Sequence, residues 1–351
     1  MPRRSLEGHR LVDDWFLEFA RGEFFGTPWG PVVPRETSSS SAPRTRLTSH
    51  MPSIAVTYNQ VSYEVKRIVA ALRDLSVEVS MVDDRKVVFP CRRGDFGGWG
   101  GADGWGSTDG FLVRSLSASH GYYAALVLEH QGFEVWNSAR CLDVTNDKLK
   151  TTLALDAAGV PTPKTALALS ARSALRAIEA DLGYPCVVKP VVGSWGRLVA
   201  RLDNVHAASA VLEDREVLGS FLHKVFYLQE YLARSPSEDP GEFPRDLRVV
   251  VVGGRALGAM GRFEAPGDFR SNVARGGRTE SFPLSEEVAE LSVRAAVAVG
   301  AEFAGVDLMH DGDDWSVIEV NGTPQFRGFE SATGVDVGGE IARHVARLAK
   351  S

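Results

Sequence analysis

Acidic and amide side chains interrupt two apolar segments near the C-terminal end of the sequence. Asp307 stands inside AGVDLM, and Glu319 and Asn321 occupy alternate positions of VIEVN. The polar turn 310–314 predicts a β-hairpin. Side chains two residues apart share a strand face, so the three oxygen donors lie together if the hairpin closes. Such donors are the ligands that Mg²⁺ prefers. An exposed hairpin with an ordinary polar face is the alternative.

Two lysines and a glycine-rich turn could hold phosphates. Lys189, one of only eight lysines, ends the apolar segment PCVVK, and a buried ammonium needs an anion or a path to water. Gly193 and Ser194 follow it, in a turn whose backbone N–H groups could cover phosphates. Lys148 lies at the expected start of a helix, an end that favours anions. A surface hairpin with solvated lysines is the alternative.

Arginines gather ahead of the acidic hairpin. The strand 224–232 ends in the polar pair of LQEYL, Asp246-Leu247-Arg248 follows, and a cluster then falls within 17 residues: Arg262, Arg270, Asn272, Arg275 and Arg278. In a chain of net charge −6, this concentration predicts a site for a multiply charged anion. Nucleotide phosphates with Mg²⁺ would satisfy both signs of charge, whereas a solvated basic loop is the alternative.

The first elements that must position these residues alternate between strand and helix. Residues 51–142 are expected to form a parallel sheet with helices on its faces. Strands are expected at 53–58, 77–82, 110–117 and 133–138, with helices at 63–75 and 121–131. The glycine-rich segment 89–109 is expected to be a loop.

The rest of the chain is expected to form two further domains, 143–226 and 227–351. Helices are expected from a Thr145 cap to about Ala158, over 171–181, from a Ser285 cap over 285–300, and over 337–350. Strands are expected at 161–169, twice within 184–202, at 224–232 and in a hairpin about Gly253-Gly254 over 246–263. The segment 268–280 is expected to be a polar loop.

Composition excludes several classes of protein. A chain of 351 residues can form two or three domains, and its net charge of −6 leaves no overall basic footprint for nucleic acid. The three widely spaced cysteines show no metal-binding pattern and fit thiols of a reducing compartment. No apolar run reaches the roughly 20 residues of a membrane span. Residues 1–50 are rich in Arg, Ser and Pro and are expected to be a disordered extension. They contain no continuous apolar core like that of a secretory signal peptide, so a cytoplasmic location is expected.

The order of these motifs resembles that of the ATP-grasp ligases, from about Met51 to the C-terminus. It runs Lys148, Lys189 with its glycine turn, Glu230, Asp246-x-Arg248, Arg270-Ser271-Asn272, and Asp307 with Glu319-x-Asn321. The subgroup it resembles contains the ligases that add glutamate to ribosomal protein tails. Within it, KPVVGSWGR (189–197) and EVNGTPQFRGFESATGVDV (319–337) look most like the LysX/ArgX-type enzymes. The resemblance implies an α/β protein with α+β lobes, namely an ATP-grasp fold behind an N-terminal parallel-sheet domain.

The resemblance also implies roles for residues. Phosphate contacts would fall to Lys148, Lys189, Gly193 and Ser194, and adenosine contacts to Glu230, Tyr231 and Leu232. The nucleotide and acyl-phosphate site would be completed by Asp246, Arg270, Ser271 and Asn272, with Arg270 and Asn272 catalytic. Mg²⁺, with Mn²⁺ as the alternative, would be held by Asp307, Glu319 and Asn321. Substrate contacts would come from Arg262, Gly328, Phe329, Ala332 and Thr333, the last four resembling the glutamate-accepting version.

The activity implied is the joining of glutamate to the C-terminal glutamate of LysW, a small acidic amino-group carrier protein, in arginine or lysine biosynthesis. ATP would phosphorylate the side-chain carboxylate of the carrier, and the α-amine of glutamate would attack. Alternatives are aminoadipate as substrate, a ribosomal protein tail or pterin as acceptor, and a non-catalytic ATP-binding regulator. A homo-oligomer, dimer or tetramer, is expected. The glycine-rich insertion 94–107 departs from the pattern of the family, and no general base is identified.

Overall fold

The computed structural model describes residues 51–94, 105, 108–193, 196–233, 242–264, 277–310 and 314–350. The chain divides into two units, Met1–Ser49 and His50–Ser351, and all described residues lie in the second. Residues 1–50, which were expected to be disordered, lie outside the described residues, as does most of the glycine-rich segment 94–107.

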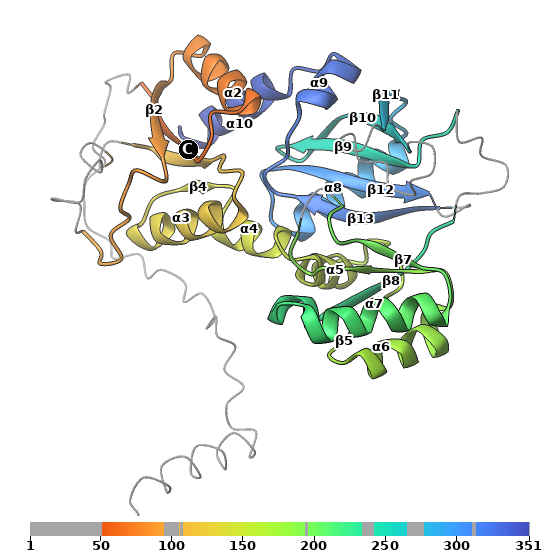
Figure 1. Cartoon of the computed structure of the whole chain (residues 1–351). Coiled ribbons are helices and arrows are strands. Elements are labelled where there is room, and N and C mark those ends of the chain that lie inside the picture. Colours follow the sequence, from red (N-terminus) through yellow and green to blue (C-terminus); the bar gives the residue numbers. More distant parts are fainter. Residues whose placement is uncertain are drawn as a thin grey trace, which may run out of the picture. The chain divides into compact units, whose positions relative to one another are not determined.

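A four-stranded parallel sheet opens the described chain, as expected (Figure 1). Its order is β2-β1-β3-β4, with β1 (Ser53–Tyr58), β2 (Glu78–Asp83), β3 (Gly110–Val113) and β4 (Val135–Trp136). Two helices, α2 (Tyr63–Asp74) and α3 (Ala118–Gln131), connect the strands. Each helix begins after a serine whose hydroxyl accepts a backbone N–H of the first turn.

An antiparallel sheet of order β5-β8-β6-β7 follows. It contains β5 (Thr165–Ala168), β6 (Cys186–Lys189), β7 (Ala200–Leu202) and β8 (Phe226–Glu230). Apolar side chains of α6 (Ala171–Ala177) and α7 (Val205–Leu218) pack on it. A π-helical turn, Ile178–Leu182, extends α6, and a 3₁₀ turn, Phe221–Lys224, precedes β8. Sequence reasoning missed α7, because apolar residues such as Val217 and Leu218 also stand on its exposed side and obscure the apolar stripe.

The start of the second helical region differs from the expectation. Thr145 does not cap a helix; it ends α4 (Ala139–Thr145), and α5 (Lys148–Ala157) begins after Asp147. The Asp147 carboxylate accepts the N–H groups of Leu149 and Lys150, whereas the Thr145 hydroxyl donates back to the Cys141 carbonyl. Asp147 therefore satisfies the free N–H groups of the first turn, and Lys148 is the first residue of the helix.

The third sheet carries the acidic hairpin. Its five antiparallel strands have the order β11-β10-β9-β12-β13. They are β9 (Asp246–Val252), β10 (Arg255–Phe263), β11 (Arg278–Phe282), β12 (Phe303–His310) and β13 (Trp315–Asn321). The predicted hairpin about Gly253-Gly254 is confirmed, and both glycines have positive φ. The end of the predicted loop 268–280 is wrong, because β11 begins at Arg278 and pairs with β10.

Three helices accompany this sheet: α8 (Glu286–Ala298), α9 (Arg327–Thr333) and α10 (Val337–Leu348). Ser285 caps α8, as predicted. Sequence reasoning missed α9. The sequence-based boundary at 226/227 falls at the start of β8, which belongs to the second sheet, β5-β8-β6-β7. The last helix, α10, packs on α2 near the start of the described chain. The three domain boundaries therefore stay predictions.

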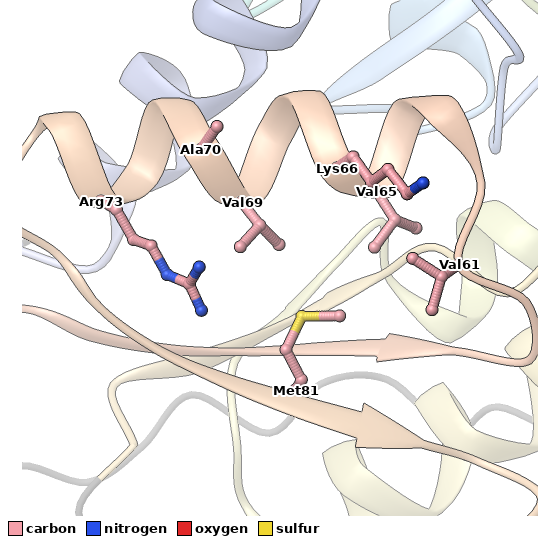
Figure 2. A pocket seen from close by; sticks show the side chains of 7 residues that line it. All are labelled: Val61, Val65, Lys66, Val69, Ala70, Arg73 and Met81. Atoms are coloured by element: carbon pink, nitrogen blue, oxygen red, sulfur yellow. The ribbon is translucent and has the colours of Figure 1, made fainter.

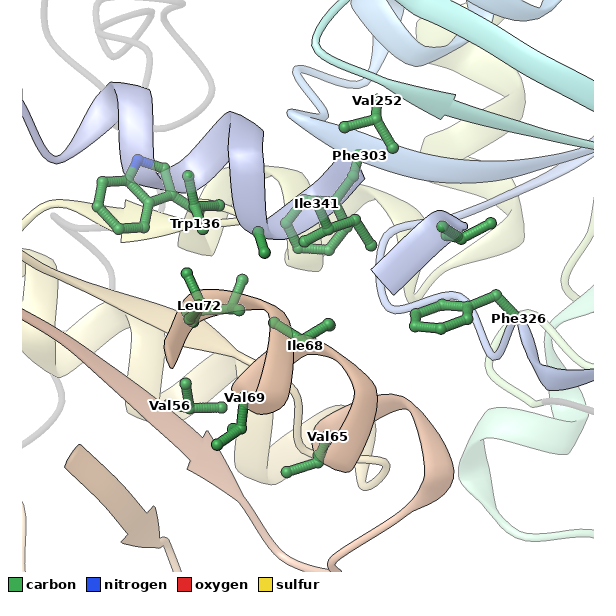
Figure 3. Close-up of a cluster of buried hydrophobic side chains, with 14 of the residues drawn as sticks. Val56, Val65, Ile68, Val69, Leu72, Trp136, Val252, Phe303, Phe326 and Ile341 are labelled. Carbon is green, nitrogen blue, oxygen red and sulfur yellow. The ribbon is translucent and has the colours of Figure 1, made fainter. Parts of the chain in front are cut away.

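The two faces of the third sheet have different partners. Leu247, Val249 and Val251 point to a core shared with α8 and α5. The alternate residues Val250 and Val252 point to the other face, where they pack with α2 and α10 (Figure 3). This second face changes character along the strands, because the positions before Val250 on β9 are Arg248 and Asp246. The candidate site occupies this polar end.

Candidate active site

The acidic hairpin is confirmed, and its register brings the three oxygen donors together. Strands β12 and β13 are antiparallel with Asp307 opposite Glu319 and Asn321 opposite Gly305. An irregularity between Asp307 and Leu308 lets both Val317 and Val320 face the apolar core, while Glu319 and Asn321 share the other face with Asp307. Gly305 leaves space on this face where a side chain would meet Arg248 and Pro324.

Asp307 is buried in a network of two carboxylates and two guanidinium groups. Arg248 lies opposite it on β9 and binds both of its oxygens, with Nη2 at 2.7 Å from Oδ2. Arg262 Nη2 lies 3.0 Å from the same oxygen and its Nε donates to Asp246. The four formal charges cancel, which is how a protein tolerates buried ions. The network therefore spans β10, β9 and β12 at the polar end of one sheet face.

The two carboxyl groups respond in opposite directions. Burial by itself raises the pKa of Asp307, but Arg248 and Arg262 outweigh it and hold that pKa below its ordinary value. Burial dominates at Asp246, whose pKa is raised although Arg262 opposes the shift. Both guanidinium groups donate hydrogen bonds to Asp307, whereas at Asp246 the negative charge of Asp307 adds to the effect of burial. Asp307 is consequently the carboxylate held most firmly in its charged form.

The predicted phosphate lysines meet at the same place. Lys148 Nζ lies 3.7 Å from Glu319 Oε1 and donates to the Gly193 carbonyl at 2.6 Å. Lys189, at the end of β6, donates to Gln229 on β8. Burial lowers the pKa of Lys189 to about 8, with Lys148 adding to the shift and Glu319 opposing it. The ammonium groups of Lys148 and Lys189 thus lie close to the acidic hairpin. This arrangement could bind a polyanion together with a metal ion.

The expected adenosine contacts follow β8. Glu230 closes a reciprocal contact with Lys164: its carboxylate accepts the Lys164 N–H, and its own N–H donates to the Lys164 carbonyl at 2.9 Å. The Tyr231 ring lies 5.2 Å from the guanidinium carbon of Arg201 and 5.3 Å from that of Arg245. The Leu232 carbonyl accepts from Arg245. These contacts hold the segment in place, and its role toward adenosine stays a prediction.

The candidate substrate residues have different environments. Arg262 is a member of the buried network rather than of an exposed basic patch, with its side chain 11% exposed. A Cβ added at Gly328 would meet no atom within 4 Å, and Ala332 is partly exposed. Phe329 is buried in the same hydrophobic cluster as Val250 and Ile341. The Thr333 hydroxyl donates to the Phe329 carbonyl at 2.8 Å.

Several predicted residues cannot be placed. Ser194, Arg270, Ser271 and Asn272 lie outside the described residues, as does Arg275. Their predicted roles at the phosphates and in catalysis are therefore untested. Sequence reasoning also left Gln229 and Arg245 without a role, although both are buried and contact predicted site residues. A polar residue inside an apolar strand, as in FYLQE, was the signal for the first.

The donor set fits a divalent cation by chemistry. The described residues contain no group of three or more His, Cys, Asp or Glu side chains that could hold a metal, but the predicted set has two carboxylates and an amide. A carboxylate has about four acceptor positions, and the arginines take three at Asp307. The Asn321 amide nitrogen donates toward the Gly305 carbonyl at 3.4 Å. One position on Asp307, the Glu319 carboxylate and the Asn321 amide oxygen are thus suitable ligands.

A cavity of about 220 Å³ lies elsewhere, between α2 and β2 (Figure 2). Val61, Val65, Val69 and Met81 form its apolar lining, and Lys66 and Arg73 stand at its sides. None of these is a predicted site residue. The ligand-binding hypothesis therefore rests on the polar sheet face and not on this cavity.

Comparison with known proteins identifies the class. The family model of the RimK-like ATP-grasp domain matches residues 145–345, the part of the chain that holds every predicted site residue. The chain belongs to this family of ATP-grasp ligases, whose members use ATP and divalent metal ions to join a carboxylate to an amine.

Individual proteins of known name are similar to this chain. The glutamate–LysW ligase ArgX of Sulfolobus acidocaldarius is 32% identical over 235 residues, covering 67% of this chain and 80% of the relative. The α-aminoadipate–LysW ligase LysX of Saccharolobus solfataricus is 32% identical over 62% of this chain and 76% of the relative. An ATP-grasp RimK domain protein from Sphaerobacter thermophilus has the same fold, with a TM-score of 0.65 at 22% identity over 83% of this chain and 98% of its own.

Proposed function

We propose that this chain joins the α-amine of glutamate to the side-chain carboxylate of the C-terminal glutamate of a LysW-type carrier protein. The similarity to ArgX over two thirds of the chain supports the choice of substrate and partner. The reaction consumes ATP and releases ADP and phosphate. Among the residues that the structure describes, no helix is long and apolar enough to cross a membrane. We place the reaction in the cytoplasm and expect the enzyme to form a dimer or tetramer.

The observation that carries the proposal is the meeting of Lys148, Lys189 and Glu319. These residues come from α5, β6 and β13, which are distant in sequence. Their convergence gives one place where two phosphate-binding cations stand beside an oxygen ligand for a metal. The second of these lysines, Lys189, is partly buried, and its pKa is lowered to about 8, a shift of the kind that is frequent at functional sites.

The chemistry needs charge compensation more than a nucleophile. Transfer of the γ-phosphoryl group to the carrier carboxylate brings two anions together, and the α-amine of glutamate then displaces phosphate from the acyl phosphate. Lys148 and Lys189 bind and orient the polyphosphate by charge. A divalent cation, proposed to be Mg²⁺ on Asp307, Glu319 and Asn321, supplies neutralisation of the phosphate oxygens when bound. Arg248 and Arg262 keep Asp307 ionised and oriented.

Selection of glutamate over aminoadipate is proposed to depend on α9. Gly328, Ala332 and Thr333 lie on this short helix, which starts six residues after Asn321 in the sequence. The metal ligands and the amino-acid contacts are therefore parts of one continuous segment. The relatives that accept glutamate and those that accept aminoadipate are about equally similar to this chain, so the choice requires a direct test.

The test is to weigh the carrier. The enzyme is incubated with ATP, Mg²⁺ and a purified LysW-type protein, with glutamate or aminoadipate as the amine. Addition of the mass of one glutamyl residue, with faster ADP release for glutamate, is the expected result. A carrier truncated by its terminal glutamate is the matched control and should remain unmodified. No mass gain with either amino acid would refute the proposed partner.

A further inference from the structure

The connection from β13 to α9, residues 322–326, has no helix or strand of its own. It joins the proposed metal ligands to the proposed amino-acid helix, so its position sets the distance between them. A segment without a backbone ladder needs other partners for its buried N–H and C=O groups. In this protein those partners are three buried side chains of the N-terminal region: Glu64, Arg114 and Asn137.

Asn137 follows β4 and connects both ends of the acidic hairpin. Its side chain is fully buried. The amide nitrogen donates to the Phe303 carbonyl at 2.8 Å and to the Gly322 carbonyl at 2.6 Å. The amide oxygen accepts the Glu302 N–H at 2.8 Å. One side chain thus ties the start of β12 to the residue that comes directly after Asn321.

Arg114 follows β3 and holds the middle of the connection. Its Nη2 donates to the Pro324 carbonyl at 2.8 Å, and the guanidinium carbon lies 5.8 Å from the Phe303 ring and 5.9 Å from the Phe326 ring. Burial lowers its pKa to about 10. A fully buried cation with one hydrogen bond adds little net stability. The clearest effect of Arg114 is to hold Pro324 by a hydrogen bond and Phe326 by a contact with its ring.

Glu64, in the first turn of α2, holds the far end. Its buried carboxylate accepts the N–H groups of Phe326 and Arg327 at 3.2 and 3.3 Å, where α9 begins. Neighbouring contacts continue the attachment: the Tyr63 hydroxyl donates to Glu330 at 2.7 Å, and Arg67 pairs with Asp336. The first turn of α2 therefore fixes the start of the proposed amino-acid helix.

We propose that Glu64, Arg114 and Asn137 are positioning residues of the ligation reaction. They hold the connection 322–326 at its end, middle and start, and so set the place of Asn321 and Glu319 relative to α9. The inference deepens the proposed function and depends on it for the identity of the substrates. It assigns to the parallel sheet of the N-terminal region a direct part in aligning metal and amino acid, in addition to its part in the shared core.

Paired variants separate positioning from packing. Glu64→Gln keeps an oxygen that accepts both N–H groups, and Arg114→Lys keeps a donor; Glu64→Leu and Arg114→Met remove them at similar volume. Gly322→Ala displaces the connection without deleting a partner, because an added Cβ would lie 2.6 Å from Thr145 Oγ1. Lys66→Ala, on the exposed surface of the same helix as Glu64, is the control.

Three readouts are measured on the full chain. They are kcat and KM for glutamate, the Mg²⁺ dependence of ADP binding by calorimetry, and the unfolding temperature. The truncating variants and Gly322→Ala should lower kcat by up to about 100-fold, since displacement by about 1 Å suffices for this. They should raise the Mg²⁺ concentration needed for tight ADP binding and leave ADP binding without Mg²⁺ unchanged. Glu64→Gln, Arg114→Lys and Lys66→Ala should stay close to the parent.

Truncating variants that are folded and keep the parental kcat, KM and Mg²⁺ dependence would overturn the proposal, whatever their unfolding temperature. If Glu64→Leu and Arg114→Met do not fold, unchanged kinetics in Gly322→Ala would overturn it instead. The Mg²⁺ dependence of ADP binding needs neither carrier nor glutamate. A wrong acceptor would therefore abolish ligation in every variant, including the parent, and leave this readout intact.

Discussion

Replacing each proposed metal-ligating carboxylate by its amide should separate the buried network from the metal site. Asp307 is 3% exposed and contacts two guanidinium groups, whereas the Glu319 side chain is 33% exposed and pairs with Lys148 at 3.7 Å. Both Asp307→Asn and Glu319→Gln should abolish ligation. Only the first should destabilise the fold.

The magnitude follows from the charges left behind. Without its negative charge at 307, the network holds Arg248 and Arg262 against Asp246 alone, and breaking a buried pair costs about 3–5 kcal/mol. At about 2.1 cal/mol/K per residue over roughly 300 residues, that loss lowers the unfolding temperature by about 5–8 °C. For Glu319→Gln the loss is at most about 1 kcal/mol, since its ion pair is partly solvated.

Thermal unfolding followed by circular dichroism, together with ATP-dependent ligation, measures both effects. Glu340→Gln is the matched control, because Glu340 pairs with two largely exposed arginines, Arg255 of β10 and Arg343 of α10. Equal unfolding temperatures for Asp307→Asn and the parent would refute the inference that the network carries stability. Full ligation by Glu319→Gln would refute the assignment of a metal to the hairpin.

Four further predictions concern the rest of the chain. Because the pKa of Lys189 is lowered to about 8, the affinity for ATP should fall about tenfold between about pH 7 and pH 9, as the ammonium group of the free enzyme loses its proton. Calorimetry measures this affinity. Lys189→Arg should make the affinity nearly independent of pH over the same range. The same shift should make the fold more stable as pH rises from 8 toward the ordinary lysine pKa of about 10.4, since the unfolded chain keeps the proton longer. Phe329→Ala should cost about 3–5 kcal/mol by emptying a core position, and an unchanged denaturant midpoint would contradict that. Deleting residues 1–49 should leave ligation by 50–351 unchanged, and a loss of carrier modification would assign the segment a role.

Local chemistry was readable wherever it depended on neighbours in the sequence. The alternation in VIEVN predicted a shared face for Glu319 and Asn321, and the turn residues predicted the hairpin that places Asp307 opposite Glu319. The order of Lys148, Lys189 and the acidic hairpin was enough to resemble the ATP-grasp ligases, and the family model confirms it. A period of two residues and the oxygen or ammonium type of a side chain need no tertiary contact to be recognised.

Partners distant in the sequence were decided only by the tertiary structure. Nothing near Asp307 in the chain indicates that Arg248 and Arg262 neutralise it, because those contacts arise from the pairing of β9 with β10 and β12. Nothing near residues 322–326 indicates that Glu64, Arg114 and Asn137 hold them, since these partners are 185 to 262 positions away. Sequence patterns report which side chains share a face, whereas a buried charge or backbone group takes its partner from whichever element the fold packs against it.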